Sequence, residues 1–190
     1  MIIAITGLRG SGKTTIGGII AKKLGAKFYD LDKEIEKNIK TTIQDFVEKK
    51  GWEFFRKTES KTLEKVIKKL KTKKHTKEKI TILSLGGGAI IKEKNAKFLK
   101  KNCFIVYLQD TPKNCTKKIL ESNKKHKNNN RPALTRQKTL ITEMEELYKT
   151  RHKIYKENAN FILKRSDDTE KDTEKLFSKL KRSAVKILLS

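Results

Sequence analysis

A glycine-rich turn lies between an apolar strand and a helix at the start of the chain. The strand reads MIIAIT, the turn from Gly7 to Thr15 reads GLRGSGKTT, and the helix continues as IGGIIAKKL. The turn matches the pattern G-x-x-x-x-G-K-[ST] through Gly7, Gly12, Lys13 and Thr14. Glycines let backbone amides converge on an anion without side-chain clashes, and the helix N-terminus adds its dipole. This phosphate-binding turn therefore predicts a site for a nucleoside triphosphate.

Two side chains of the turn suit phosphoryl transfer. The Lys13 ammonium can reach the β- and γ-phosphates, and the Thr14 hydroxyl can ligate Mg²⁺. A glycine-rich turn that merely ended a strand would need neither of them. The nucleotide-binding residues that we expect here are Gly7, Gly10, Ser11, Gly12, Lys13, Thr14 and Thr15. The turn identifies a phosphate donor and leaves the acceptor open.

Short apolar runs alternate with helical patterns along the chain. We expect strands at Ile2–Thr6, Lys27–Tyr29, Lys79–Leu85, Cys103–Leu108 and Asn160–Leu163. We expect helices at Lys13–Leu24, Lys33–Asn38, Thr42–Lys50, Glu53–Lys71, Glu93–Lys100, Pro112–Ser122, Lys138–Glu157 and Thr169–Leu189. Continuous apolar strands separated by helices are typical of a parallel sheet covered on both faces. The predicted fold is a three-layer α/β domain with a five-stranded parallel sheet.

The chain is strongly basic, with 47 basic and 22 acidic residues and a net charge of +25. Such a charge would favour nucleic acid through counterion release. The lysines, however, are spread over nearly every helical segment, and arginine, the better base reader, is scarce. We therefore expect no specific nucleic-acid partner, although a basic nucleotide-binding protein that binds nucleic acid stays an alternative.

Cysteines and hydropathy bear on the compartment. Cys103 and Cys115 have neither a disulfide framework nor metal-ligand spacing, so we expect buried or half-buried thiols in a reducing environment. No apolar run approaches the ~20 residues that a bilayer span needs. The N-terminal apolar run is too short for a signal peptide. We expect a cytoplasmic protein with no membrane partner.

The stretch FYDLD places Asp30 and Asp32 directly after a strand candidate. Carboxylates there would lie at the carboxyl edge of a parallel sheet, where open α/β folds bind ligands. One could hold Mg²⁺ through water, and the other could accept a proton from an attacking hydroxyl. Alternatively, Asp32 could simply cap a helix that begins at Lys33.

Four later stretches also carry functional candidates. In GWEFFRKTE, Arg56 and Glu59 are three residues apart and could form a helix-surface ion pair of little energetic value. The strand in LSLGGGAI runs straight into three glycines, which implies close approach of the backbone to a ligand. The stretch RPAL follows the polar run SNKKHKNNN, which we interpret as a mobile lid. Arg151 opens RHKIYKENA ahead of the last strand.

In their order and spacing, these motifs resemble those of the shikimate kinases from Ile2 to about Leu163. The matching patterns are G-x-x-G-x-G-K-T-T, FYDLD, G-x-x-x-FR-x-x-E, LSLGGG, RP-x-L and R-x-x-x-Y-x-x-x-A. The resemblance implies transfer of the γ-phosphoryl group of ATP to the 3-hydroxyl of shikimate, in the pathway to chorismate and the aromatic amino acids. A kinase of another hydroxy acid, such as gluconate, is the nearest alternative, but such relatives lack the arginine pair with the triple glycine.

The resemblance also implies a role for each matching residue. Lys13, Asp32 and Arg131 would be catalytic, with Arg131 reaching the phosphates from the lid. Thr14 and Asp30 would hold Mg²⁺, with ATP as co-substrate. Lys118 and Arg131 would join the nucleotide site, and the shikimate site would comprise Asp32, Arg56, Glu59, Gly86, Gly87, Gly88 and Arg151.

Several features depart from the family pattern, among them the residues at positions 52 and 118. Trp52 stands where the family usually has glutamate, and we expect it to pack rather than bind a ligand. Lys118 stands where many members place an arginine over the adenine.

The expected organisation is one monomeric kinase domain over residues 1–190. Its core would comprise 1–30, 79–110 and 138–190, with a substrate-binding region at about 31–60 and a lid at about 120–135. Apolar residues recur at helical spacing between residues 169 and 189, which predicts a C-terminal helix docked on the sheet.

Overall fold

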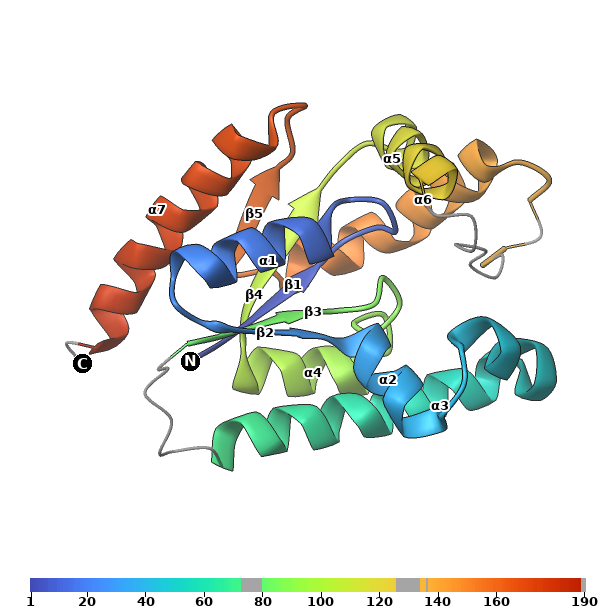
Figure 1. The fold of residues 1–190 in the computed structure, drawn as a ribbon, viewed down its shortest axis with the longest axis horizontal. Helices are drawn as coiled ribbons and strands as arrows, with labels where there is room; N and C mark the ends of the chain where they lie inside the picture. The colour runs from blue at the N-terminus through green and yellow to red at the C-terminus, as the bar shows by residue number, and fades with distance from the viewer. Residues whose placement is uncertain (73–79, 126–133, 136, 189–190) are drawn as a thin grey trace.

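A computed structural model describes residues 1–72, 80–125, 134–135 and 137–188 (Figure 1). The strands are β1 (Ile2–Thr6), β2 (Lys27–Asp30), β3 (Thr81–Ser84), β4 (Phe104–Gln109) and β5 (Phe161–Lys164). The helices are α1 (Lys13–Lys23), α2 (Leu31–Ile39), α3 (Ile43–Thr72), α4 (Glu93–Asn102), α5 (Pro112–Lys125), α6 (Leu140–Asn158) and α7 (Thr169–Leu188). No helix in these ranges is both long and apolar enough to cross a membrane.

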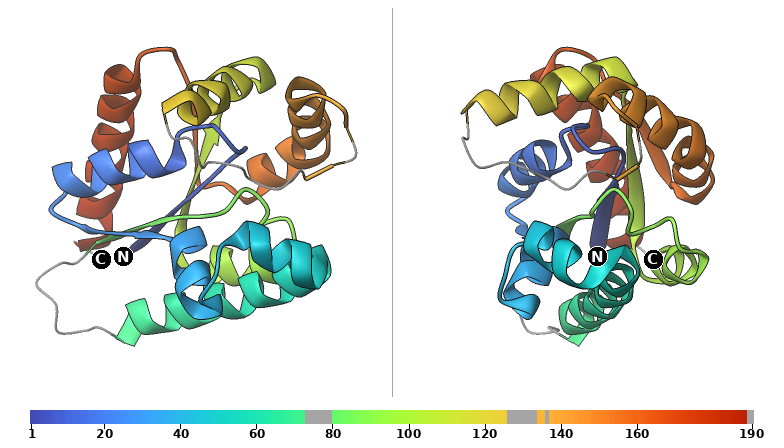
Figure 2. Two further views of the ribbon diagram at one scale, coloured as in Figure 1. Left: turned by 45° about the vertical axis from the view of Figure 1, so that its right-hand side comes forward. Right: turned by 90° about the vertical axis from the view of Figure 1, so that its right-hand side faces the viewer.

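The five strands form one parallel sheet in the order β2-β3-β1-β4-β5, which confirms the predicted fold. Helices α1 and α7 cover one face, and α3, α4 and α6 cover the other (Figures 1 and 2). The chain leaves central β1 toward β2 on one side and returns to β4 on the other. This order puts the topological switch point beside β1, where ligands of open α/β sheets bind.

The first four residues of strand β1 are apolar because of how the strand packs. Successive side chains of a strand point to opposite faces. Ile3 and Ile5 pack in the core that contains α1 and α7, whereas Ile2 and Ala4 pack in the core on the opposite face. Because both faces are covered, every position of β1 is buried.

Helix α2 begins earlier than predicted, and the residue that caps it is different. Asp30 is the N-cap, and its Oδ1 accepts hydrogen bonds from the backbone N–H groups of Asp32 at 3.1 Å and Lys33 at 3.5 Å. The alternative in which Asp32 caps a helix from Lys33 is therefore wrong. Because Asp30 already accepts hydrogen bonds from backbone N–H groups at the start of α2, the Asp32 side chain is not needed as a cap.

Other boundaries follow the sequence more closely. The predicted break between two helices falls at Gly51 within α3, where φ is 80° and ψ is 165°. Helix α5 continues to Lys125, so residues 122–125, which were expected in a loop, are helical, and the rest of that expected loop lies outside the described residues. In α7, Leu176 and Leu180 are buried against the sheet, as the spacing of apolar residues predicted.

The two cysteines are free thiols, as expected from their number and spacing. Cys103 is half-buried and Cys115 is buried. Burial raises the pKa of each thiol to about 12, so both stay protonated and unreactive at neutral pH.

Adjacent glycines in α1 give a test of how closely this helix packs on the sheet. A Cβ at Gly17 would lie 2.7 Å from Cε2 of Phe28, whereas a Cβ at Gly18 would meet nothing within 4 Å. Gly17→Ala should therefore lower the free energy of unfolding by about 1–3 kcal/mol through overpacking. Gly18→Ala, the matched control, should raise it by about 0.5–1 kcal/mol through helix propensity. Urea unfolding measures both, and a Gly17→Ala variant as stable as wild type would contradict the packing.

Candidate active site

The phosphate-binding turn connects β1 to α1 at the switch point of the sheet. Gly10 adopts φ of 80°, and a Cβ there would lie 2.5 Å from the carbonyl oxygen of Cys115 on α5. Only glycine meets both conditions. The Lys13 Nζ folds back over the turn and donates to the carbonyls of Gly7 at 3.1 Å and Leu8 at 2.8 Å. The turn therefore places an ammonium over its own backbone, where the phosphates of a nucleotide would lie.

Thr14 and Asp30 form the oxygen-rich side of this turn. The Thr14 hydroxyl donates to Asp30 Oδ2 at 2.8 Å, while Asp30 Oδ1 caps α2. Hydroxyl and carboxylate oxygens are the ligands that Mg²⁺ prefers, and it takes its other ligands from phosphates and water. The described residues contain no group of three or more metal-binding His, Cys, Asp or Glu side chains. Thr14 and Asp30 therefore fit an Mg²⁺ ion that also takes ligands from nucleotide phosphates.

The triple-glycine turn, Gly86 to Gly88, follows β3 and approaches several charged side chains. A Cβ at Gly86 would lie 2.6 Å from Asp32 Oδ1 and 3.3 Å from Glu59 Oε1. A Cβ at Gly88 would overlap the guanidinium of Arg56. The glycines thus leave space into which three charged groups converge from α2 and α3.

Gly87 joins this turn to both the phosphate-binding turn and α6. A Cβ at Gly87 would lie 3.3 Å from the Gly7 carbonyl oxygen. The Gly87 carbonyl accepts hydrogen bonds from the Tyr155 hydroxyl at 2.5 Å and from Arg151 Nη1 at 3.4 Å. The structure therefore brings the predicted donor and acceptor residues together around two touching turns.

Arg56 is fixed on three sides. Its Nη1 donates to Glu59 Oε2 at 2.7 Å, and its Cζ lies 5.2 Å from the ring centroids of both Trp52 and Phe55. Glu59 is only 2% exposed, so this is not the weak surface pair that spacing alone allowed. Burial raises the pKa of the Glu59 carboxyl, and the charge of Arg56 opposes that rise. Aromatic faces and a buried carboxylate together orient the guanidinium.

The family model for shikimate kinase matches residues 9–181 of the chain. The chain belongs to the shikimate kinase family.

Similar proteins agree over most of the chain. Shikimate kinase 2 of Photorhabdus laumondii is 33% identical over 172 residues, which cover 90% of this chain and 91% of the relative. The shikimate kinase of Bacillus licheniformis is 36% identical over 156 residues, 80% of this chain and 78% of the relative. A structure of shikimate kinase from Acinetobacter baumannii in complex with shikimate superimposes with a TM-score of 0.78 at 27% identity, covering 100% of this chain and 95% of that chain.

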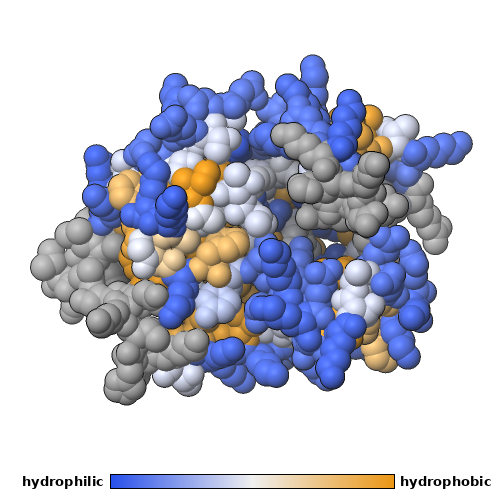
Figure 3. Space-filling view, viewed as in Figure 1, coloured by the Kyte–Doolittle hydropathy of each residue, from blue (hydrophilic) through white to orange (hydrophobic). Residues whose placement is uncertain are grey.

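Membership of the shikimate kinases confirms the predicted class of activity, ATP-dependent phosphorylation of shikimate. Membership of this family does not support the two alternatives that the sequence left open, a kinase of another hydroxy acid and a nucleic-acid-binding protein. Much of the face of the molecule in Figure 3 is hydrophilic, as expected if most of the lysine side chains are solvated.

Of Lys118 and Arg131, the two nucleotide ligands predicted outside the phosphate-binding turn, the structure describes Lys118. The Lys118 Nζ donates to Asp110 Oδ2 at 2.6 Å, and that carboxylate is only 1% exposed. Its ammonium is thus engaged at the end of β4, beside the phosphate-binding turn. Arg131 lies outside the described residues.

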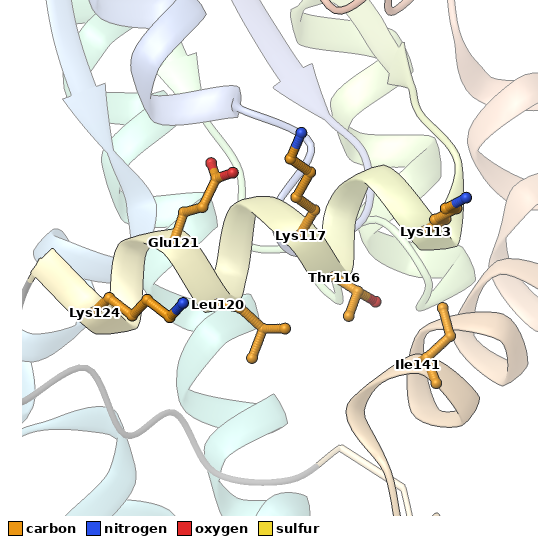
Figure 4. A pocket seen from close by; sticks show the side chains of 7 residues that line it. All are labelled: Lys113, Thr116, Lys117, Leu120, Glu121, Lys124 and Ile141. Carbon is orange, nitrogen blue, oxygen red and sulfur yellow. The ribbon is translucent and has the colours of Figure 1, made fainter.

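A separate pocket lies beside α5 (Figure 4). Thr116 and Leu120 of α5 point toward Ile141 of α6, and charged side chains of α5 complete the lining. Its lining contains none of the residues predicted to bind shikimate.

Sequence reasoning missed two ion pairs next to the phosphate-binding turn. Arg9, at an unassigned position of the phosphate-binding turn, binds Glu143 of α6 at 2.7 Å. Arg165 follows β5, pairs with Asp172 at 2.9 Å and lies 3.7 Å from where a Cβ of Gly12 would be. Because the partners are more than 100 residues apart in the first case, no local spacing could have indicated it. The scarcity of arginine in the sequence was the feature that could have drawn attention to Arg9 and Arg165.

The stacking of Trp52 on Arg56 can be tested in this shikimate kinase. Trp52→Leu should raise the KM for shikimate about two- to tenfold, because a cation–π contact that orients Arg56 is lost. The KM for ATP should not change. Phe54→Leu is the matched control, since Phe54 is 56% exposed and lies beside Lys57 instead. Steady-state kinetics measure both variants, and equal effects of the two would contradict a specific role for Trp52.

Proposed function

We propose that this chain transfers the γ-phosphoryl group of ATP to the 3-hydroxyl of shikimate across its two touching turns. The observation that carries the proposal is the close approach of the two turns: a Cβ at Gly87 would lie 3.3 Å from the carbonyl oxygen of Gly7. Phosphoryl transfer depends mainly on in-line positioning and charge neutralisation. A donor site and an acceptor site built on adjoining backbone turns meet the first requirement.

Arg56 of α3 and Arg151 of α6 would bind the carboxylate of shikimate beside the triple-glycine turn. Arg56 is held by Glu59, and Arg151 is held on Gly87. A planar guanidinium can grip a carboxylate through two parallel hydrogen bonds, which an ammonium cannot do. Backbone amides of Gly86, Gly87 and Gly88 would support the bound ring.

Asp32 would orient the 3-hydroxyl and accept its proton. Its Oδ1 reaches the triple-glycine turn, and its charge contributes to raising the pKa of Glu59. A carboxylate near the attacking hydroxyl increases the nucleophilicity of its oxygen as the bond to phosphorus forms. Lys13 would stabilise the charge that develops on the transferred group.

The nucleotide and the metal ion would bind at the phosphate-binding turn. The amides from Gly7 to Thr15 would cradle the phosphates, and Lys118 and Arg131 would complete the nucleotide site. Thr14 would hold Mg²⁺ directly and Asp30 through water, in keeping with their 2.8 Å contact. When bound, this ion would neutralise charge on the β- and γ-phosphates.

The remaining expectations form part of the same proposal. The chain would act in the cytoplasm as a monomer without a specific nucleic-acid or membrane partner. Its core would comprise 1–30, 79–110 and 138–190, with shikimate bound by residues from about 31–60 and a lid at about 120–135.

A panel of hydroxy acids tests the substrate. With ATP and Mg²⁺, coupled ADP release should be much faster with shikimate than with quinate or gluconate, because Asp32 and the two arginines match one hydroxyl–carboxylate spacing. Omission of Mg²⁺ should remove the activity. Faster turnover of gluconate than of shikimate would overturn the proposal.

Asp32→Asn tests the hydroxyl end of the site. Loss of a proton acceptor should lower kcat by about 100-fold or more, with little change in the KM for ATP. Asp45→Asn serves as the control, since Asp45 is an exposed carboxylate on α3 and should leave turnover near wild type. A near-normal kcat for Asp32→Asn would show that this carboxylate does not act in the reaction.

A further inference from the structure

Tyr155 is a fully buried tyrosine one helical turn after Arg151 on α6. Its hydroxyl donates to the carbonyl of Gly87 at 2.5 Å, and the same carbonyl accepts from Arg151 Nη1 at 3.4 Å. Two side chains of one helix thus converge on a single backbone oxygen in the triple-glycine turn.

We propose that Tyr155 is a positioning residue for shikimate, which fixes the Gly87 carbonyl and thereby the place of Arg151. The inference rests on the proposed function, in which Arg151 binds the substrate carboxylate. Tyr155 itself touches neither shikimate nor ATP in this arrangement.

The two hydrogen bonds differ in strength. The bond from Arg151 is at the long limit for N–H···O geometry, so by itself it would hold the guanidinium loosely. The bond from Tyr155 is short, and loss of a donor to a half-buried carbonyl has a cost in free energy. The tyrosine therefore determines where the carbonyl lies, and the long arginine side chain follows it.

The phenol stays a hydrogen-bond donor over the whole working pH range. Burial raises the pKa of Tyr155 to about 12, and the nearby charges of Arg151 and Arg56 oppose that rise. The hydroxyl and Arg151 Nη1 meet at the same carbonyl, so the phenol lies beside the arginine proposed to bind the carboxylate. A protonated phenol at this point adds no negative charge that would repel a carboxylate ligand.

Neighbouring rings prevent Tyr155 from turning away. Its ring lies 5.1 Å from that of Tyr107, whose hydroxyl is 2.9 Å from Nδ1 of His152. His152 in turn stacks on Tyr148 at 4.7 Å. This aromatic packing explains how the hydroxyl keeps its direction, and it provides a matched control.

Tyr155→Phe keeps the ring and removes only the hydroxyl. We expect the KM for shikimate to rise about five- to tenfold, as one lost hydrogen bond implies, with kcat and the KM for ATP within about twofold of wild type. Titration with shikimate followed by calorimetry should show the same loss in Kd. An unchanged shikimate KM would overturn the inference, even if the variant were less stable.

Tyr107→Phe is the matched control. Tyr107 is 1% exposed and also makes one hydrogen bond through its hydroxyl, but to His152 rather than to the triple-glycine turn. This variant should lose stability without a change in shikimate KM. An equal rise of KM in both variants would mean that Tyr155 acts only as part of the core.

Arg151→Lys separates failure of the inference from failure of the proposed function. If Arg151→Lys leaves the shikimate KM unchanged, the assignment of Arg151 as a carboxylate ligand fails. If it raises the KM while Tyr155→Phe does not, only the positioning role fails. With both roles intact, the double variant should lose less affinity than the product of the two single losses, because the residues act through one carbonyl.

Discussion

The active site depends on the pairing of β1 with β3 in one register. Ile5 is paired with Ser84, and the Leu85 N–H donates to the Ile5 carbonyl at 2.9 Å, so the ladder continues into the loop. In this register the two parallel strands end at the same edge of the sheet and at the same level along it, so the turns that follow them begin side by side. The triple-glycine turn therefore meets the phosphate-binding turn, and α2, α3 and α6 need only bring side chains to that contact. A slip of one residue would exchange the faces of β3 and separate the turns.

The type of charge, rather than its amount, distinguishes the site in a chain of net charge +25. Lysine side chains lose little by staying in water, and most of them do. The guanidiniums of Arg9 and Arg56 instead make ion pairs of 2.7 Å with carboxylates that are 5% and 2% exposed. Such buried pairs give fixed directions, which a small carboxylate or phosphate requires and a solvated ammonium does not supply.

Prediction from sequence succeeded where a local rule was enough. Continuous apolar runs and helical repeats located the strands and helices. Motif spacing predicted Asp32, Arg56, Glu59 and Arg151 as site residues, and the structure brings these side chains close to the triple-glycine turn. It failed where two local rules competed. Asp30 and Asp32 are both acceptable N-caps, and the choice depends on β2, whose pairing with β3 runs to Asp30 opposite Ser84. The nucleotide-binding role of Lys118 stays a prediction made by counting along the chain, and only the structure shows the buried Asp110 that pairs with it.

The sequence by itself determined the order of strands and helices, the phosphate-binding turn and the chemical types at the acceptor side. These properties follow from short-range periodicity and spacing, so they are visible without any contact between distant segments. Only the tertiary structure decided which groups share a partner: Trp52 with Arg56, Arg9 with Glu143, and Tyr155 with Arg151 at one carbonyl. Such contacts depend on how helices from separate parts of the chain pack on the sheet. A local sequence pattern contains no information on how close two distant segments come in space.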